Sequence, residues 1–108
     1  MEYIGNIIYD KVVLESNIKF VVYGIGTMGK RLFAFLKNTG RLDKIDCICD
    51  VNKELWGTLY NGVLVISPDE AVNEKKDCHF LITGKYAEEQ IMFLQKNGVN
   101  RIHTFLEV

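Results

Sequence analysis

The feature that most constrains this chain is an apolar segment that continues into a glycine-rich turn and then into a helical pattern. Residues 19–23 are Lys-Phe-Val-Val-Tyr, and residues 24–29 are Gly-Ile-Gly-Thr-Met-Gly. Glycines at G-x-G-x-x-G spacing let a strand turn tightly, let backbone amides approach a diphosphate and let the following helix pack closely on the strand. The first amides of that helix face the anion, whose charge the helix dipole favours. The pattern predicts a nucleotide-binding turn made by Gly24, Gly26, Thr27, Met28 and Gly29.

Length and composition indicate one ordinary globular domain. The 108 residues suffice for one core, and 48% hydrophobic with 25% charged residues is close to the globular average. A formal net charge of −1 gives no reason to expect nucleic acid or an anionic membrane as a partner. No apolar run approaches the ~20 residues of a membrane helix, and the N-terminus lacks an export signal. We therefore expect a cytoplasmic protein.

Strand and helix patterns alternate along the rest of the chain. An amphipathic helix follows from Thr27, Asn61-Gly62 signals a tight turn, and Ser67-Pro68 begins a helix with a capping residue. The alternation predicts an α/β fold, a single Rossmann-like three-layer domain with a five-stranded parallel sheet in the order 3-2-1-4-5. The expected strands are residues 18–23, 45–49, 63–66, 78–83 and 101–106, and the expected helices are 27–39, 68–73 and 87–97.

The first residues precede this unit. Ile4, Ile7, Ile8 and Val12 have near-helical spacing, so residues 1–17 are expected to be a leading helix or linker, and residues 18–108 the Rossmann-like nucleotide-binding domain. The helix would cover one edge of the sheet or dock a partner.

Asp50 ends the second expected strand, about 20 residues beyond Gly29. At that position a carboxylate accepts hydrogen bonds from a ribose diol and repels a 2′-phosphate, which favours NAD over its phosphorylated form. The alternative is that Asp50 only begins the turn that continues into Val51 and Asn52.

Thr83 ends the fourth expected strand, and Gly84, Lys85 and Tyr86 follow it. The strand order reverses at this point, where ligands bind, so residues 83–86 are expected to line the site. Lys85 could neutralise a phosphate, and Tyr86 could stack on a ring or bond a sugar hydroxyl. Equally, this segment could be only the first turn of the next helix.

Other chemistries find little support. The glycine turn also fits most of a P-loop, but Arg31 stands where a hydroxyl would hold magnesium. No Tyr-x-x-x-Lys, G-x-S-x-G or H-x-x-x-H pattern occurs, so no catalytic residue is expected.

The three cysteines are interpreted as reduced, buried thiols, and a metal site is disfavoured because the spacing matches no recurrent zinc pattern. The residues considered for that site are Cys47, Cys49, Cys78, His79 and His103.

Five segments, residues 23–29, 50–52, 55–57, 61–66 and 67–70, carry a family resemblance. With Tyr-Gly-Ile-Gly-Thr-Met-Gly, Asp-Val-Asn, Leu-Trp-Gly, Asn-Gly-Val-Leu-Val-Ile and Ser-Pro-Asp-Glu, the chain resembles Rossmann-like domains of bacterial surface-polysaccharide and nucleotide-sugar biosynthesis. It is similar to the domain that opens pilin-glycosylation sugar acetyltransferases and to the CoA-binding-type domain of sugar epimerase/dehydratases. The resemblance covers about residues 19–106. It implies a nucleotide or nucleotide-sugar held by Gly24, Gly26, Gly29 and Asp50.

The relatives owe their chemistry to an acetyltransferase half or a larger catalytic domain that these residues do not include. We therefore expect a domain that binds NAD(H) or a nucleotide-sugar in a bacterial glycan pathway and is not catalytic alone. A neighbouring catalytic domain or a second copy of the chain are its expected protein partners. The alternative is an interaction or regulatory module whose glycines serve only helix packing. An oxidoreductase without its substrate half would need catalytic residues that the sequence does not show.

Overall fold

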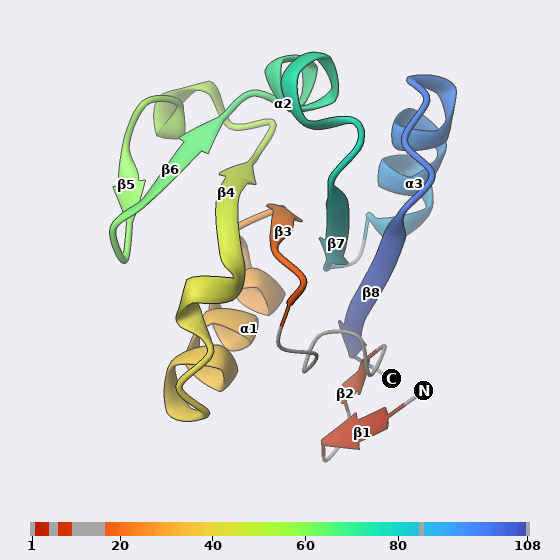
Figure 1. Ribbon diagram of the computed structural model, residues 1–108. Coiled ribbons are helices and arrows are strands. Elements are labelled where there is room, and N and C mark those ends of the chain that lie inside the picture. The colour runs from red at the N-terminus through yellow and green to blue at the C-terminus, as the bar shows by residue number, and fades with distance from the viewer. Residues whose placement is uncertain (1, 5–6, 10–16, 85, 108) are drawn as a thin grey trace.

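A computed structural model describes residues 2–4, 7–9, 17–84 and 86–107 (Figure 1). Among these residues, no helix has the length and apolar character needed to cross a membrane. The main elements, in chain order, are β1 (Glu2–Ile4), β2 (Ile7–Tyr9), β3 (Phe20–Tyr23), α1 (Thr27–Asn38), β4 (Ile45–Cys49), β5 (Leu59–Tyr60), β6 (Val63–Ile66), α2 (Pro68–Lys75), β7 (His79–Thr83), α3 (Ala87–Lys96) and β8 (Ile102–Glu107). Short 3-10 turns at Leu42–Lys44 and Lys53–Leu55 precede and follow β4.

The sheet has a parallel centre and antiparallel edges. Its strand order is β1-β2-β8-β7-β3-β4-β6-β5. The five strands β6, β4, β3, β7 and β8 pair in parallel, and their spatial order is the one expected for them. Because β3 lies between β4 and β7, the order reverses there, and the carboxyl ends of these strands frame a crevice.

The prediction of a purely parallel, five-stranded sheet is wrong at both edges. Beyond β6, the turn at Asn61 and Gly62 has positive φ at both residues (49° and 80°), as a two-residue hairpin turn requires. The chain therefore reverses at once, and Leu59–Tyr60 pairs with β6 as the antiparallel strand β5. The Asn-Gly turn was expected, but the strand before it was not.

The expected leading helix is also wrong where the structure describes it. Glu2–Ile4 and Ile7–Tyr9 are antiparallel strands, and β2 pairs with the outer edge of β8. Unpaired backbone groups on β8 offer a partner, and β-branched residues favour strands, so sheet pairing prevails over the near-helical spacing of the isoleucines. Residues 10–16 of the predicted segment lie outside the described residues.

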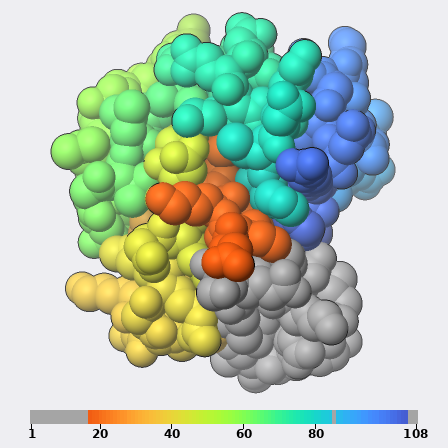
Figure 2. Space-filling model, in the orientation of Figure 1, coloured from red at the N-terminus to blue at the C-terminus, as the bar shows by residue number. Residues whose placement is uncertain are grey.

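Helices cover both faces of the sheet, which confirms the α/β three-layer arrangement. Phe20 and Val22 of β3 pack toward α1, whereas Val21 and Tyr23 pack toward α2 and α3. All four side chains are buried, as expected for a central parallel strand. Seen in space-filling form, α2 (teal) lies between the β5–β6 hairpin (green) and the α3–β8 segment (blue) (Figure 2).

Local signals placed the start of α2 and the ends of α1 and α3, whereas α2 runs two residues beyond its expected end at residue 73. The Ser67 hydroxyl oxygen accepts a hydrogen bond from the Glu70 backbone amide at 3.1 Å, which caps α2. Gly40, just beyond α1, has φ of 70°, and Gly98, just beyond α3, has φ of 86°.

The cysteines and histidines lie on opposite faces of the sheet. Cys47 and Cys49 are buried, unpaired thiols on the α2–α3 side, and Cys78 is a half-buried one packed against the same side. His79 and His103 lie against Phe20 on the α1 side, with His79 Nδ1 2.8 Å from His103 Nε2. The sheet thus separates the residues that were considered for a metal site, and no group of three metal-ligating side chains occurs among the described residues.

The buried thiols predict a loss of stability in alkali. Burial, then the neighbouring Asp46 carboxylate, raises the pKa of Cys47 from 9.0 to about 12. Below pH 9 both folded and unfolded states keep this proton, so the stabilisation is complete. Above pH 9 the unfolded state releases the proton first, and the free energy of unfolding falls by up to about 1.4 kcal/mol per pH unit for this group.

Urea unfolding between about pH 8 and pH 11 measures this effect. Cys47→Ala should flatten the alkaline decline, because it removes one of the groups responsible. Cys78→Ala, which removes the half-buried thiol, is the matched control. An alkaline decline of equal slope in Cys47→Ala and the wild-type protein would contradict the prediction.

Candidate functional site

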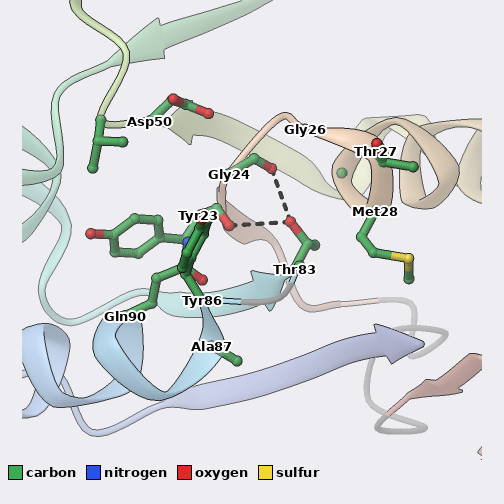
Figure 3. Close-up of a pocket in the computed structure, with 13 residues that line it drawn as sticks. Tyr23, Gly24, Gly26, Thr27, Met28, Asp50, Thr83, Tyr86, Ala87 and Gln90 are labelled. Atoms are coloured by element: carbon green, nitrogen blue, oxygen red, sulfur yellow. Dashed lines mark hydrogen bonds between the residues drawn. The ribbon is translucent and has the colours of Figure 1, made fainter. Parts of the chain in front are cut away.

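A pocket of about 820 Å³ opens at the carboxyl ends of β3, β4 and β7 (Figure 3). The first turns of α1 and α3 complete its wall. Its described lining comprises Tyr23, Gly24, Gly26, Thr27, Met28, Gly29, Asp50, Val51, Thr83, Gly84, Tyr86, Ala87 and Gln90. The structure therefore brings together all the residues that the sequence singled out, apart from Lys85, which lies outside the described residues.

Two of the three motif glycines, Gly24 and Gly29, occupy positions where the fold has no room or no suitable backbone conformation for a larger residue. Gly24 has φ of 101°, a left-handed conformation that suits glycine, and its backbone amide donates to the Cys49 carbonyl oxygen at 2.8 Å. At Gly29, an added Cβ would lie 2.3 Å from the Gly24 carbonyl oxygen. Gly29 thus lets α1 approach the turn that ends β3.

Gly26 has no such internal requirement. Its φ is −78°, and an added Cβ would meet no heavy atom within 4 Å. It is the N-cap residue of α1, no side chain caps this helix, and its first turn contains no acidic residue. The pocket therefore meets the electropositive end of a helix at a residue without a side chain, an arrangement suited to an anion.

Asp50 fastens the glycine turn to the end of β4. Its Oδ2 accepts a hydrogen bond from the Ile25 backbone amide at 2.9 Å, and its Oδ1 accepts one from the Asn52 amide at 2.8 Å. The Trp56 indole N–H donates to the Asp50 carbonyl oxygen at 2.6 Å. The contact with Asn52 is the one expected of a turn residue, and the contact with Ile25 was not expected. Each carboxylate oxygen retains a lone pair that a ligand can use.

The wall opposite Asp50 comes from the end of β7 and the start of α3. The Thr83 hydroxyl, which is buried, donates to the carbonyl oxygens of Tyr23 and Gly24 at 3.2 and 3.0 Å (Figure 3). This bond ties the glycine turn to β7. Tyr86 is 61% exposed at the pocket, and Gly84 has φ of 94°.

Four lining residues were not predicted: Tyr23, Val51, Ala87 and Gln90. Ala87, Gln90, Ile91 and Leu94 follow helical spacing, and a lone glutamine in that apolar stripe was a signal that a polar side chain would face the sheet. Tyr23 was assigned to the core, and burial and then the neighbouring Cys49 and Asp50 raise its pKa to about 12. Its phenol therefore keeps its proton further into alkaline pH than that of an exposed tyrosine.

The described lining of the pocket carries one formal charge, which is negative. Asp50 supplies the single carboxylate, and no lysine or arginine is among the described lining residues. An anion here would be stabilised by backbone amides and the helix dipole. The Asp50 carboxylate would repel a phosphate group placed beside it, such as the 2′-phosphate of NADP.

Comparisons with known proteins identify the fold. No family model matches the chain, and no curated protein matches it either. Among solved structures, the chain is similar to RSP, described as a Rex-family repressor, with a TM-score of 0.59 and 17% sequence identity. The match covers 84% of this chain and 46% of that one, so the chain spans less than half of the repressor's length. At this identity the likeness concerns the fold, which is Rossmann-like.

Proposed function

We propose that this domain binds a nucleotide diphosphate in the crevice at the end of β3, with NAD(H) as the first candidate ligand. The observation that carries the proposal is the open space at Gly26. Gly24 and Gly29 are explained by the fold, whereas Gly26 leaves room beside the first amides of α1 within the pocket. A diphosphate would accept hydrogen bonds from these amides, and Asp50 would accept bonds from a ribose diol.

The alternative ligand is a nucleotide-sugar, and its support is the sequence resemblance to glycan-biosynthesis domains. The comparisons with known proteins add no support for that pathway, so both the ligand and the pathway remain predictions. Both candidates carry a diphosphate and a ribose, and both would use Gly26 and Asp50. The described lining residues match no catalytic motif, so we propose binding rather than catalysis by this domain.

The interaction-module hypothesis makes a different prediction. It assigns Gly24, Gly26 and Gly29 to packing alone, although an added Cβ at Gly26 would meet nothing within 4 Å. The chain would then form a stable dimer whose mass is indifferent to ligand. Light scattering with and without NAD distinguishes the two hypotheses, and it also tests whether a second copy of the chain is a partner.

Calorimetry with NAD, NADP and UDP-glucose tests the proposed function. We expect the wild-type protein to bind NAD or UDP-glucose with a Kd below about 1 mM. Gly26→Val should weaken that binding at least about tenfold, which is 1.4 kcal/mol, because its side chain would occupy the space of the diphosphate.

Ala34→Val is the matched control, since it adds bulk to an exposed position of α1 away from the pocket. Circular dichroism should show that both variants are folded. Binding weaker than millimolar to all three nucleotides would refute the proposed function, and so would unchanged affinity in Gly26→Val.

A further inference from the structure

Gln90 is a polar side chain that α3 directs into the pocket. It lies in the first turns of the helix, and its backbone amide donates to the Tyr86 carbonyl oxygen at 3.0 Å. Positions 86, 87 and 90 share one face of the helix, and all three line the pocket (Figure 3). The side chain of Gln90 reaches the glycine turn at Gly24.

The carboxamide of Gln90 is close to Gly24 and incompletely hydrogen-bonded. Its Nε2 is 3.5 Å from the position that a Cβ on Gly24 would occupy. Its Oε1 is inaccessible to solvent and has no hydrogen-bond partner among the described residues. Buried polar groups nearly always have a partner. The terminal amide torsion is broad and roughly two-fold, so the group can present either its oxygen or its nitrogen to the pocket.

No group among the described residues donates a hydrogen bond to Gln90 Oε1. The Thr83 hydroxyl directs its hydrogen to the carbonyl oxygens of Tyr23 and Gly24. The side chains of Ala87 and Met28 are not hydrogen-bond donors. When the amide turns its oxygen toward the pocket, a bound ligand can supply the donor that this oxygen lacks.

We propose that Gln90 is a specificity-determining residue of this site, whose carboxamide accepts a hydrogen bond from an N–H or O–H group of the bound nucleotide. This inference rests on the proposed nucleotide-binding function. A base amino group and a sugar hydroxyl provide the same donor chemistry. A site that bonds such a donor discriminates strongly against analogues without it, because the buried acceptor then stays unpaired.

The test is NAD binding by Gln90→Met, which keeps the length of the side chain and removes both polar atoms. We expect its affinity for NAD to be about tenfold lower or more. Gln90→Glu should lose at least as much, since it adds a negative charge to a pocket that binds a diphosphate. Gln95→Met is the matched control, an exposed glutamine on the same helix, and should bind as the wild-type protein does.

Nicotinamide hypoxanthine dinucleotide, which lacks the amino group of adenine, distinguishes the two donors. If the amino group is the donor, this analogue binds the wild-type protein more weakly than NAD does, and Gln90→Met removes the difference. If a sugar hydroxyl is the donor, both dinucleotides lose affinity equally in Gln90→Met.

Equal NAD affinity in the wild-type protein, Gln90→Met and Gln95→Met would overturn the role of Gln90 and leave the proposed function intact. Failure of the wild-type protein to bind any of the nucleotides would overturn both. Urea unfolding of each variant separates a loss of affinity from a loss of folded protein.

Discussion

Gly29→Ala is expected to lower the free energy of unfolding by about 2–4 kcal/mol, in the range of severe overpacking. Alanine normally stabilises a helix interior by about 1 kcal/mol relative to glycine. Here the added methyl carbon would lie 2.3 Å from the Gly24 carbonyl oxygen and 3.1 Å from its carbonyl carbon. These are backbone atoms of a turn held by Asp50 and Thr83, so they cannot rotate away. The steric cost therefore exceeds the gain in helix propensity.

Gly26→Ala is the matched control for this variant. The added methyl would meet nothing within 4 Å, and φ of −78° is accessible to alanine. Reduced entropy of the unfolded chain favours alanine and the N-cap preference disfavours it, so we expect a net change within about 1 kcal/mol. Urea unfolding followed by circular dichroism measures both. Equal stability of Gly29→Ala and Gly26→Ala would show that α1 does not approach the turn as closely as the structure indicates.

The sequence was sufficient for the parts of the fold that depend on neighbouring residues. The bounds of β4 and β6 and the cap of α2 were predicted because the strand formers, Asn61-Gly62 and Ser67-Pro68 act within a few residues of themselves. The order of the five parallel strands followed from the rules of βα connection. These rules also placed Gly24, Asp50 and Gly84 at one edge of the sheet.

The errors concern contacts between distant parts of the chain. The pairing of β1 and β2 with the sheet depends on the free edge of β8, roughly a hundred residues away, and no short-range sequence signal indicates it. The bond from the Ile25 amide to Asp50 and the bond from Thr83 to Gly24 likewise join separate strands. Sequence patterns identified most of the residues that line the pocket, but not Tyr23, Val51, Ala87 and Gln90. They could not show which hydrogen bonds these residues already make there.

Asp50 combines both kinds of role, and a pair of substitutions separates them. Asp50→Ala leaves the backbone amides of Ile25 and Asn52 without their acceptors. A hydrogen bond to a charged group contributes about 1.5–3 kcal/mol, and the exposed bond to Asn52 contributes less. We therefore expect the substitution to lower the free energy of unfolding by about 2–4 kcal/mol. Asp50→Asn keeps one acceptor oxygen and should cost about half as much. Asp46→Asn is the matched control on the same strand. It breaks a surface ion pair with Lys75, 3.0 Å long, and should cost no more than about 1 kcal/mol.

The ratio of NAD to NADP affinity then reports on the ligand role of Asp50. If its carboxylate bonds the ribose diol, Asp50→Asn should weaken NAD binding and relieve the repulsion of a 2′-phosphate, so the ratio should fall about tenfold. If Asp50 serves only the turn, both dinucleotides should lose affinity in proportion to the folded protein lost, and the ratio should stay constant. Calorimetry at a temperature where urea unfolding shows the variant to be folded separates these outcomes. The two hydrogen bonds to Ile25 and Asn52 are compatible with either result, because each oxygen of the carboxylate can accept a second hydrogen bond from a bound ligand.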